Sequence, residues 1–283
     1  MKNRIFENTV DLLAEYEPVI VKEIVVHKPD IQVLYGNCVQ LMSQMQDESV
    51  NLVISSPPYN LKKSYNQYKD DVPRSVYLDW IRMVFRQISR VLKSNGSFFL
   101  NMGSSSKDAW IAIDVANVAR ELFVLQNEIT WVKSITVNGT THGHFTPINS
   151  NRYLNWTNER IYHFTKDGKR EINRLAIGVP YTCKSNVSRW KSKHDIRCAG
   201  NSWFIAYETI FDKAQRGNHP ATFPVQLPEN CIKLHGITEG MLVLDPFVGT
   251  GTTLVAAQRL GVNAIGMEID EKYIDVAKRR LGI

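Results

Sequence analysis

Four residues suited to holding an amino group follow an apolar segment early in the chain. The motif is Ser56-Pro57-Pro58-Tyr59, and the run before it, Val50 to Ser55, is typical of a buried strand. The prolines fix an extended backbone and remove two amide donors, so carbonyl oxygens near Ser56 and Pro57 can accept hydrogen bonds. The Ser56 hydroxyl is a further acceptor, and Tyr59 offers a flat ring for stacking. Such a set suits a planar base that carries an exocyclic amino group.

A second motif, about 190 residues later, suits a ribose-bearing ligand. It begins at the end of a predicted strand, Met241 to Leu244, and its two glycines allow a ligand to approach the backbone closely. A carboxylate, Glu268, follows at the end of the next predicted strand, where dinucleotide sites place an acid for ribose hydroxyls. We also expect a threonine of the motif to cap the helix that follows. The predicted cofactor-binding residues are Asp245, Pro246, Phe247, Gly249, Gly251, Thr252, Thr253 and Glu268.

The glycine pattern excludes the commonest nucleotide sites. The turn lacks the full G-x-G-x-x-G spacing of dinucleotide folds and the Gly-Lys-Ser/Thr of a phosphate-binding loop. NAD and ATP are therefore disfavoured, and a ribose-bearing ligand without a pyrophosphate fits better.

Together, and in this order, the two motifs resemble the S-adenosylmethionine-dependent amino methyltransferases that modify DNA. The catalytic motif precedes the cofactor motif, which is similar to the β group of these enzymes, and the resemblance extends to Asn218–Pro224 and over most of the chain. It implies S-adenosylmethionine as the cofactor and duplex DNA as the substrate, with the target base rotated out of the stack. Ser56 and the Pro57 region would orient the amino group, Tyr59 would stack on the base, and the turn with Glu268 would hold the cofactor.

The resemblance also decides between bases and adds one site residue. In this family a serine at the first catalytic position is associated mostly with cytosine N4, so we expect N4-methylcytosine, with adenine N6 as the alternative. Relatives often carry Gly-Asp where this chain has Gly36-Asn37, and Asn37 becomes a cofactor-binding candidate on that ground. Methylation of RNA or of a protein amide, and a DNA-binding protein without catalysis, are weaker alternatives. A cognate restriction endonuclease and a homodimer are expected from the resemblance alone.

Positive charge is concentrated in the middle of the chain. Residues 131–216 hold fourteen Lys and Arg against six Asp and Glu, whereas the remainder holds twenty against twenty-two. Because cations contact DNA phosphates, we interpret residues 138–216 as a target-recognition segment. We expect a loop at residues 62–69 to close over the flipped base. The predicted DNA-binding residues are Lys62, Lys63, Lys184, Arg189, Lys191 and Lys193.

The elements that must position these residues alternate between strands and helices. The pattern predicts an α/β fold, a doubly wound, Rossmann-like methyltransferase sheet of about seven strands with a target-recognition insertion, in which both motifs lie at carboxyl ends of adjacent strands. Residues 1–137 would form the catalytic half and residues 217–283 the cofactor-binding half of one domain. Apolar residues at helical spacing from Ser75 to Val91, Trp80 among them, predict a helix that packs on the sheet.

Composition narrows the environment of the protein. No apolar run approaches the length of about 18 residues that a membrane helix needs. The four cysteines show neither close pairing nor metal-ligand spacing, so we expect reduced thiols, no metal site and a cytoplasmic protein. The net charge of +6 is consistent with a polyanionic partner.

Overall fold

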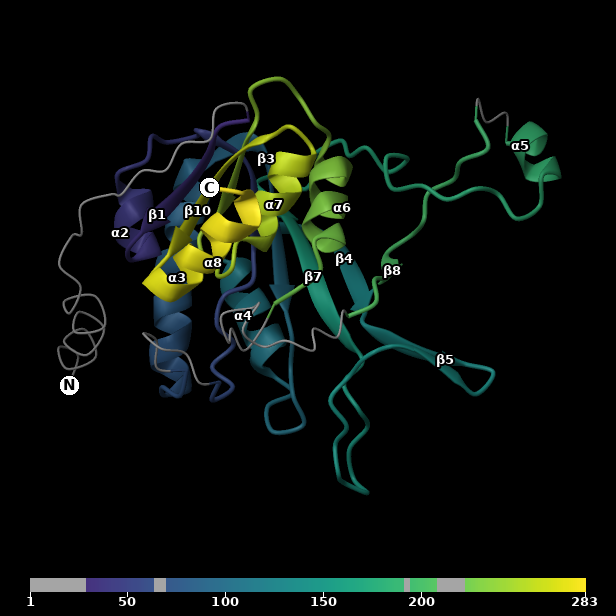
Figure 1. Ribbon diagram of the computed structural model, residues 1–283, viewed down its shortest axis with the longest axis horizontal. Coiled ribbons are helices and arrows are strands. Elements are labelled where there is room, and N and C mark those ends of the chain that lie inside the picture. Colours follow the sequence, from purple (N-terminus) through teal and green to yellow (C-terminus); the bar gives the residue numbers. More distant parts are fainter. Residues whose placement is uncertain (1–28, 64–69, 191–193, 208–221) are drawn as a thin grey trace.

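The computed structural model describes residues 29–63, 70–190, 194–207 and 222–283. Its centre is an eight-stranded sheet in the order β1-β10-β9-β2-β3-β7-β4-β8, with helices on both faces (Figure 1). A separate two-stranded hairpin, β5 (Ser134–Val137) with β6 (Thr140–Gly143), projects from the sheet. The predicted doubly wound α/β fold is confirmed, with one strand more than expected.

The first five strands of the sheet run parallel and bring the two motifs together. They are β1 (Ile31–Tyr35), β10 (Asn263–Glu268), β9 (Leu242–Asp245), β2 (Val50–Ser55) and β3 (Leu92–Met102). Strands β2 and β9 are direct neighbours, with Leu52 opposite Val243 and Val53 opposite Leu244. Since both strands point the same way, the turns that follow them meet at one edge of the sheet, as predicted.

The other half of the sheet is mostly antiparallel and brings new residues to that same edge. Strand β7 (Asn158–Thr165) runs antiparallel between β3 and β4 (Val124–Val132), and β8 (Ser202–Phe204) pairs with β4 in parallel. The start of β7 therefore lies beside the ends of β3 and β4: Asn101 is opposite Ile161, and Trp131 is opposite Glu159.

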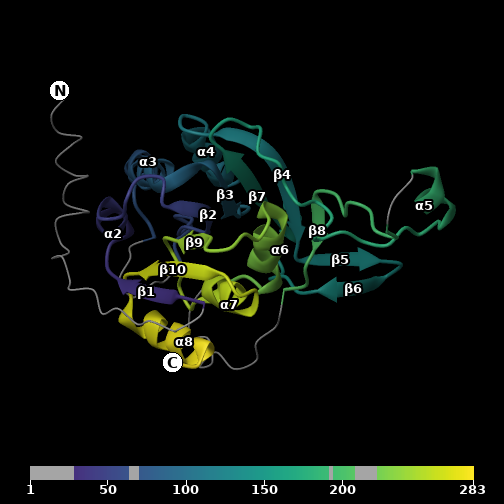
Figure 2. The ribbon, with the colours of Figure 1, turned by 90° about the horizontal axis from the view of Figure 1, so that it is seen from above.

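Helices of the described part of the chain cover both faces of the sheet, as the view from above shows (Figure 2). One layer contains α2 (Cys38–Ser43), α3 (Arg74–Val91) and α4 (Ile111–Ala119), and the other contains α6 (Gln226–His235), α7 (Thr252–Arg259) and α8 (Glu271–Leu281). The remaining helix, α5 (Ser185–Arg189), lies away from the sheet.

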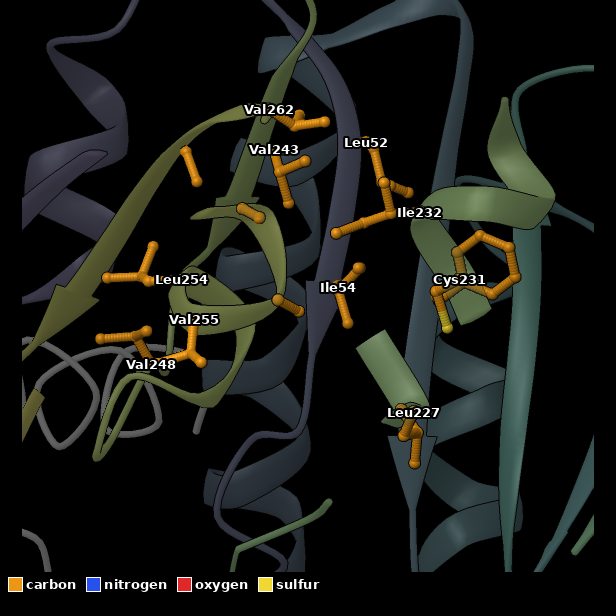
Figure 3. Packing of buried hydrophobic residues seen from close by; sticks show 14 of the residues in the cluster. Leu52, Ile54, Leu227, Cys231, Ile232, Val243, Val248, Leu254, Val255 and Val262 are labelled. Carbon is orange, nitrogen blue, oxygen red and sulfur yellow. The ribbon is translucent and has the colours of Figure 1, made fainter. Parts of the chain in front are cut away.

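Alternation along the strands divides the core into two layers. Leu52 and Ile54 of β2 pack on the side of α6 and α7, together with Val243 and Ile232 (Figure 3). Val53 faces the opposite layer, which contains the apolar side of α3. Each such buried side chain contributes about 1.5–3 kcal/mol of transfer free energy, so both faces hold the strands that carry the site.

The segment 138–216, assigned to target recognition, contributes β7 and β8 to the sheet, and the apolar residues of β7 are buried between its neighbours. The other described residues of this segment, 138–157, 166–190, 194–201 and 205–207, lie outside the strands of the sheet.

One expectation needs correction. The helix after the cofactor motif is not capped by a threonine: α7 begins at Thr252, and its cap position is Gly251, in the left-handed conformation with φ +81°.

Candidate active site

A cavity of about 900 Å³ opens at the carboxyl edge of the parallel strands. Such a crevice, where the strand order reverses, is where open α/β sheets bind ligands. Its wall includes the turns after β1, β2, β9 and β10 and the start of β7. The predicted residues on this wall are Asn37, Ser56, Pro57, Pro58, Tyr59, Lys63, Pro246, Phe247, Gly249, Thr252 and Glu268.

Two hydrogen bonds stabilise the predicted catalytic turn. The hydroxyls of Ser56 and Tyr59 lie 2.8 Å apart and share a hydrogen bond. The Tyr77 hydroxyl of α3 donates to the Pro58 carbonyl at 2.7 Å and so fixes the peptide between the catalytic residues. The geometry brings the serine oxygen and the tyrosine ring to the same side of one cavity.

Side chains from β3, from β7 and from the residue after β4 join the two catalytic hydroxyls. Asn101 of β3 donates from Nδ2 to the Tyr59 hydroxyl at 2.9 Å and to Oε2 of Glu159 at 2.7 Å. Glu159 of β7 also accepts from Tyr59 at 3.2 Å, and its other oxygen accepts at 2.9 Å from Nζ of Lys133, which directly follows β4. A Cβ on Gly103 would meet Tyr59 Cε2 at 2.9 Å and Glu159 Cδ at 3.1 Å. Tyr59 and Glu159 therefore pack closely against the backbone at Gly103, in addition to their hydrogen bonds.

The opposite wall centres on the carboxylate of Glu268. Its Oε2 accepts from the Gly249 amide at 2.9 Å, and its Oε1 accepts from the amides of Ile269 and Asp270 at 2.8 and 3.0 Å. Burial raises the pKa of Glu268 to about 7, although these three amide donors oppose the shift. One side chain thus connects the glycine turn after β9 to the turn after β10.

Three residues of the cofactor motif shape its turn and do not line the cavity. Asp245 is buried, and its carboxylate accepts from the Thr253 hydroxyl at 2.6 Å and the Phe247 amide at 3.1 Å. Burial raises the pKa of Asp245 to about 7. A Cβ at Gly251 would lie 2.8 Å from that of Ala277, so this glycine permits close packing of α7 on α8. Asp245, Gly251 and Thr253 were predicted to contact the ligand, but the cavity wall contains none of them.

Aromatic and polar residues outside the two motifs complete the wall. Phe247 meets Trp80 of α3 in an edge-to-face contact, with ring centroids 5.5 Å apart. Sequence reading assigned Trp80 to packing, because its helical spacing gives no sign of the cavity that its helix borders. It missed Asn101, Lys133 and Glu159 altogether, since single polar residues at strand ends form no motif. The further wall residues that it missed include Trp80, Asn101, Gly103, Lys133, Glu159 and Tyr273.

Comparison with known proteins identifies the family. The family N6_N4_Mtase, described as DNA methylase, matches residues 50–279 and so spans both motifs and every strand of the sheet except β1. The chain belongs to this family of DNA methylases. S-adenosylmethionine, the cofactor implied by the resemblance, is consistent with membership of this family.

Relatives of the methylase match most of its length. The type II methyltransferase M.HpaI of Haemophilus parainfluenzae is 30% identical over 254 residues, covering 89% of this chain and 74% of that protein. The DNA adenine methyltransferase YhdJ of Escherichia coli (strain K12) is 27% identical over 263 residues, covering 89% and 82%.

Solved structures share the fold of the methylase. The PvuII cytosine-N4-specific DNA methyltransferase has a TM-score of 0.66 at 19% identity, covering 92% of this chain and 97% of that one. M1.HpyAVI, in complex with S-adenosylmethionine, has a TM-score of 0.53 at 22% identity, covering 88% and 99%. At these identities, the likeness supports the arrangement of the sheet and not the choice of base.

Asn37 and the base of the predicted closing loop lie close to the methylase cavity. Asn37 caps α2, accepting from the Val39 amide at 2.9 Å, and also lines the cavity. The buried carboxylate of Asp70 accepts from the amides of Asn60 and Lys63 at 2.7 and 2.9 Å, which ties together the two ends of the loop. Residues 64–69 lie outside the described structure.

The predicted DNA-binding cations of the methylase fall into separate groups. Lys63 lines the cavity, whereas Lys62 points to Asp71, with which it forms an exposed ion pair at 3.3 Å. Lys184 and Arg189 lie at α5, exposed and away from the sheet (Figure 1). Lys191 and Lys193 lie outside the described residues. From Asn218–Pro224, the described part begins at Thr222, and both Thr222 and Phe223 line the cavity.

No helix in the described parts of the methylase is both long and apolar enough to cross a membrane. The same residues contain no group of three or more His, Cys, Asp or Glu side chains that could bind a metal ion.

Proposed function

We propose that this methylase transfers a methyl group from S-adenosylmethionine to the exocyclic N4 amino group of cytosine, within a specific sequence of duplex DNA. The observation that carries the proposal is the single cavity that contains both the Ser56–Tyr59 turn and the glycine turn with Glu268. A reaction between two large partners requires such a shared space, since it must bring a nitrogen and a methyl group into line.

The residues of the cofactor wall fit S-adenosylmethionine. A ribose presents hydroxyl donors, and the carboxylate of Glu268 is an acceptor on the cavity wall. Gly249 allows the backbone to approach the ligand, and Phe247 with Trp80 offers aromatic surface beside it. When bound, the cofactor supplies a methyl group on a positively charged sulfur, which is already electrophilic.

The catalytic wall supplies orientation. The target nitrogen is a weak nucleophile because its lone pair is delocalised into the base. Ser56 and a carbonyl near Pro57 accept hydrogen bonds from the amino group and favour a tetrahedral nitrogen, while the Tyr59 ring stacks on the base. A nitrogen held in this way would accept the methyl group that the cofactor would supply, and its surplus proton would pass to water. Positioning of this kind supplies several kcal/mol of the barrier reduction.

The choice of cytosine depends on the serine at position 56, which in this family is associated mostly with N4 methylation. Adenine N6 is the second candidate, favoured by the 27% identity to an E. coli DNA adenine methyltransferase over 89% of this chain. Both reactions need an extruded base, at a cost of a few kcal/mol, about 2–4. We further propose that residues 138–157 and the α5 region contact the DNA, and that an endonuclease of the same specificity accompanies the enzyme in a restriction-modification system.

The decisive experiment is methyl transfer from labelled S-adenosylmethionine to mixed-sequence duplex DNA, followed by nucleoside mass spectrometry. We expect N4-methyldeoxycytidine. Detection of N6-methyldeoxyadenosine would instead identify adenine as the target base and would leave the family, the cofactor and the mechanism unchanged. Cofactor binding without any methylated nucleoside on genomic DNA of varied sequence would contradict the proposed activity, and the same assay on RNA would then test the next substrate class.

A further inference from the structure

Glu159 is a carboxylate inside the catalytic wall that neither motif contains. Its side chain is 16% exposed, and that of its partner Lys133 is 18% exposed. Three donors converge on it: Lys133 Nζ at 2.9 Å on Oε1, and Asn101 Nδ2 at 2.7 Å and the Tyr59 hydroxyl at 3.2 Å on Oε2. An ionised carboxylate only accepts hydrogen bonds, so it can satisfy all three donors at once.

The hydrogen bonds around Tyr59 favour one direction. Asn101 Nδ2 donates to the Tyr59 oxygen at 2.9 Å. The acceptors near the Tyr59 hydrogen include Ser56 Oγ at 2.8 Å, Glu159 at 3.2 Å and the backbone carbonyl of Asn101 at 3.3 Å, and the charged carboxylate is the strongest acceptor of these three. The 2.8 Å contact between Ser56 and Tyr59 is then donated by Ser56.

We propose that Glu159 is a positioning residue that sets the direction of the Ser56 hydroxyl. With Tyr59 donating to Glu159 and Ser56 donating to Tyr59, Ser56 Oγ has a lone pair for a hydrogen of the target amino group beside the long 3.5 Å contact from Asn101 Nδ2. The reverse direction would make Tyr59 donate to Ser56 and would leave a serine hydrogen, a donor, facing an amino group that also donates. This inference depends on the proposed function, because it assigns Ser56 as the acceptor for the amino group.

A glutamine at position 159 is nearly the same size as glutamate, but it disturbs the direction of the hydrogen bonds from Ser56 through Tyr59 to residue 159. Its amide must turn an N–H₂ group either toward Lys133, which is itself a donor, or toward Asn101 and Tyr59. Because all three neighbours donate to Glu159, neither orientation satisfies the network, and in the second one Tyr59 is turned toward Ser56. Packing alone would tolerate the substitution, so its effect reports on donor and acceptor direction.

The test is a double-mutant cycle between Glu159→Gln and Ser56→Ala, measured as single-turnover methyl transfer at saturating DNA and cofactor. In the wild-type background, Glu159→Gln should lower the rate roughly 10- to 100-fold, the range expected for one hydrogen bond to a charged group. In the Ser56→Ala background it should lower the rate by less than about 3-fold, because a residue that acts through Ser56 loses its effect without it. KM for DNA and the cofactor Kd should stay within about 2-fold of the wild-type values.

The matched control is Glu128→Gln on the neighbouring strand β4. Glu128 pairs with Arg160 at 2.7 Å, is 45% exposed and does not line the cavity, so this variant should retain the wild-type rate. Thermal melting checks the fold of each variant, and Glu159→Met, which also removes the acceptor, replaces Glu159→Gln in the cycle if the latter does not fold.

Two results would overturn the assignment: an equal loss in both Ser56 backgrounds, or no loss in the wild-type background. Either leaves the proposed function intact, because the wild-type rate is measured in the same assay. A wild-type chain that methylates no DNA would instead overturn the proposed function and this inference with it.

Discussion

The two walls of the cavity are built in different ways. On the cofactor wall, the carboxylate of Glu268 accepts from backbone amides in the turns beside it. On the catalytic wall, Ser56, Tyr59, Asn101 and Glu159 bond mainly to one another, and they come from the ends of three different strands.

This difference explains what each wall can do. Backbone amides can only donate, so the carboxylate of Glu268 that they hold always serves as an acceptor. The charge state of this carboxylate depends on its burial. Hydroxyls both donate and accept, so the catalytic wall has two possible hydrogen-bond directions and needs a residue that selects one. Substitutions on the catalytic wall should therefore change turnover, whereas substitutions on the cofactor wall should change cofactor affinity.

The largest expected effect comes from Tyr59→Ala on the catalytic wall. Loss of the ring removes the stacking surface and the hydroxyl that joins Ser56 to Glu159, so the turnover rate should fall on the order of 100-fold or more. Cofactor affinity, measured by calorimetry, should stay unchanged. Tyr59→Phe is the control, since it keeps the ring and should lose less. Unchanged turnover in Tyr59→Ala would remove this residue from the site.

On the cofactor wall, Glu268→Gln should weaken S-adenosylmethionine binding by roughly 10- to 100-fold, because it removes a charged acceptor. Burial raises the pKa of Glu268 to about 7, and ribose donors favour the ionised form. The wild-type affinity should therefore increase as the pH rises through about 7, and that dependence should vanish in the variant. Glu271→Gln, on the exposed first turn of α8, is the control. A pH dependence that persists in Glu268→Gln would show that another group titrates.

The ionisation of Glu268 should have opposite effects on cofactor affinity and on folding stability. Its folded pKa lies above the ordinary value of 4.5, so its contribution to stability is complete below about pH 4.5 and is lost as the pH rises through about 7. Thermal melting of the protein without cofactor should show this loss, and added cofactor should offset it at pH 8.

Gly251 tests how the glycine turn is packed. Alanine there would hold a left-handed φ of +81° and place its Cβ 2.8 Å from that of Ala277, so Gly251→Ala should lower the free energy of unfolding by about 2–4 kcal/mol. Gly261→Ala is the matched control: its φ is +69° with nothing within 4 Å, so the loss should be only about 1–2 kcal/mol. Equal losses in urea denaturation would mean that contact with α8 adds nothing.

The smallest effect is expected far from both walls. If Arg189 of α5 contacts a phosphate, Arg189→Gln should reduce the slope of log affinity for DNA against log salt by about 1, with turnover at saturating DNA unchanged. Lys166→Gln, whose side chain pairs with Glu48 at 3.0 Å, is the control and should leave the slope as it is. An unchanged slope in Arg189→Gln would place the DNA surface elsewhere.

Local sequence was sufficient for the cofactor turn and for most of the elements. Strand β2 has its predicted bounds, and the helix predicted from Ser75 to Val91 is α3, because apolar periodicity and flanking turn residues act within a few positions. The adjacency of β2 and β9 also followed from the alternation of strands and helices in a doubly wound sheet. The segment assigned to target recognition shows no sustained periodicity, although it contains the buried strand β7.

What the sequence by itself determined was the chemistry of the two motifs: acceptors after one strand, and a glycine turn and a carboxylate after two others. Their resemblance to a known family then implied the family and its cofactor. Only the tertiary structure decided that Asp245, Gly251 and Thr253 shape the turn while Trp80, Asn101, Lys133 and Glu159 line the cavity. The physical reason is distance along the chain. A motif is visible where neighbouring residues cooperate, whereas Ser56, Asn101 and Glu159 meet only because three strands end at one edge of the sheet.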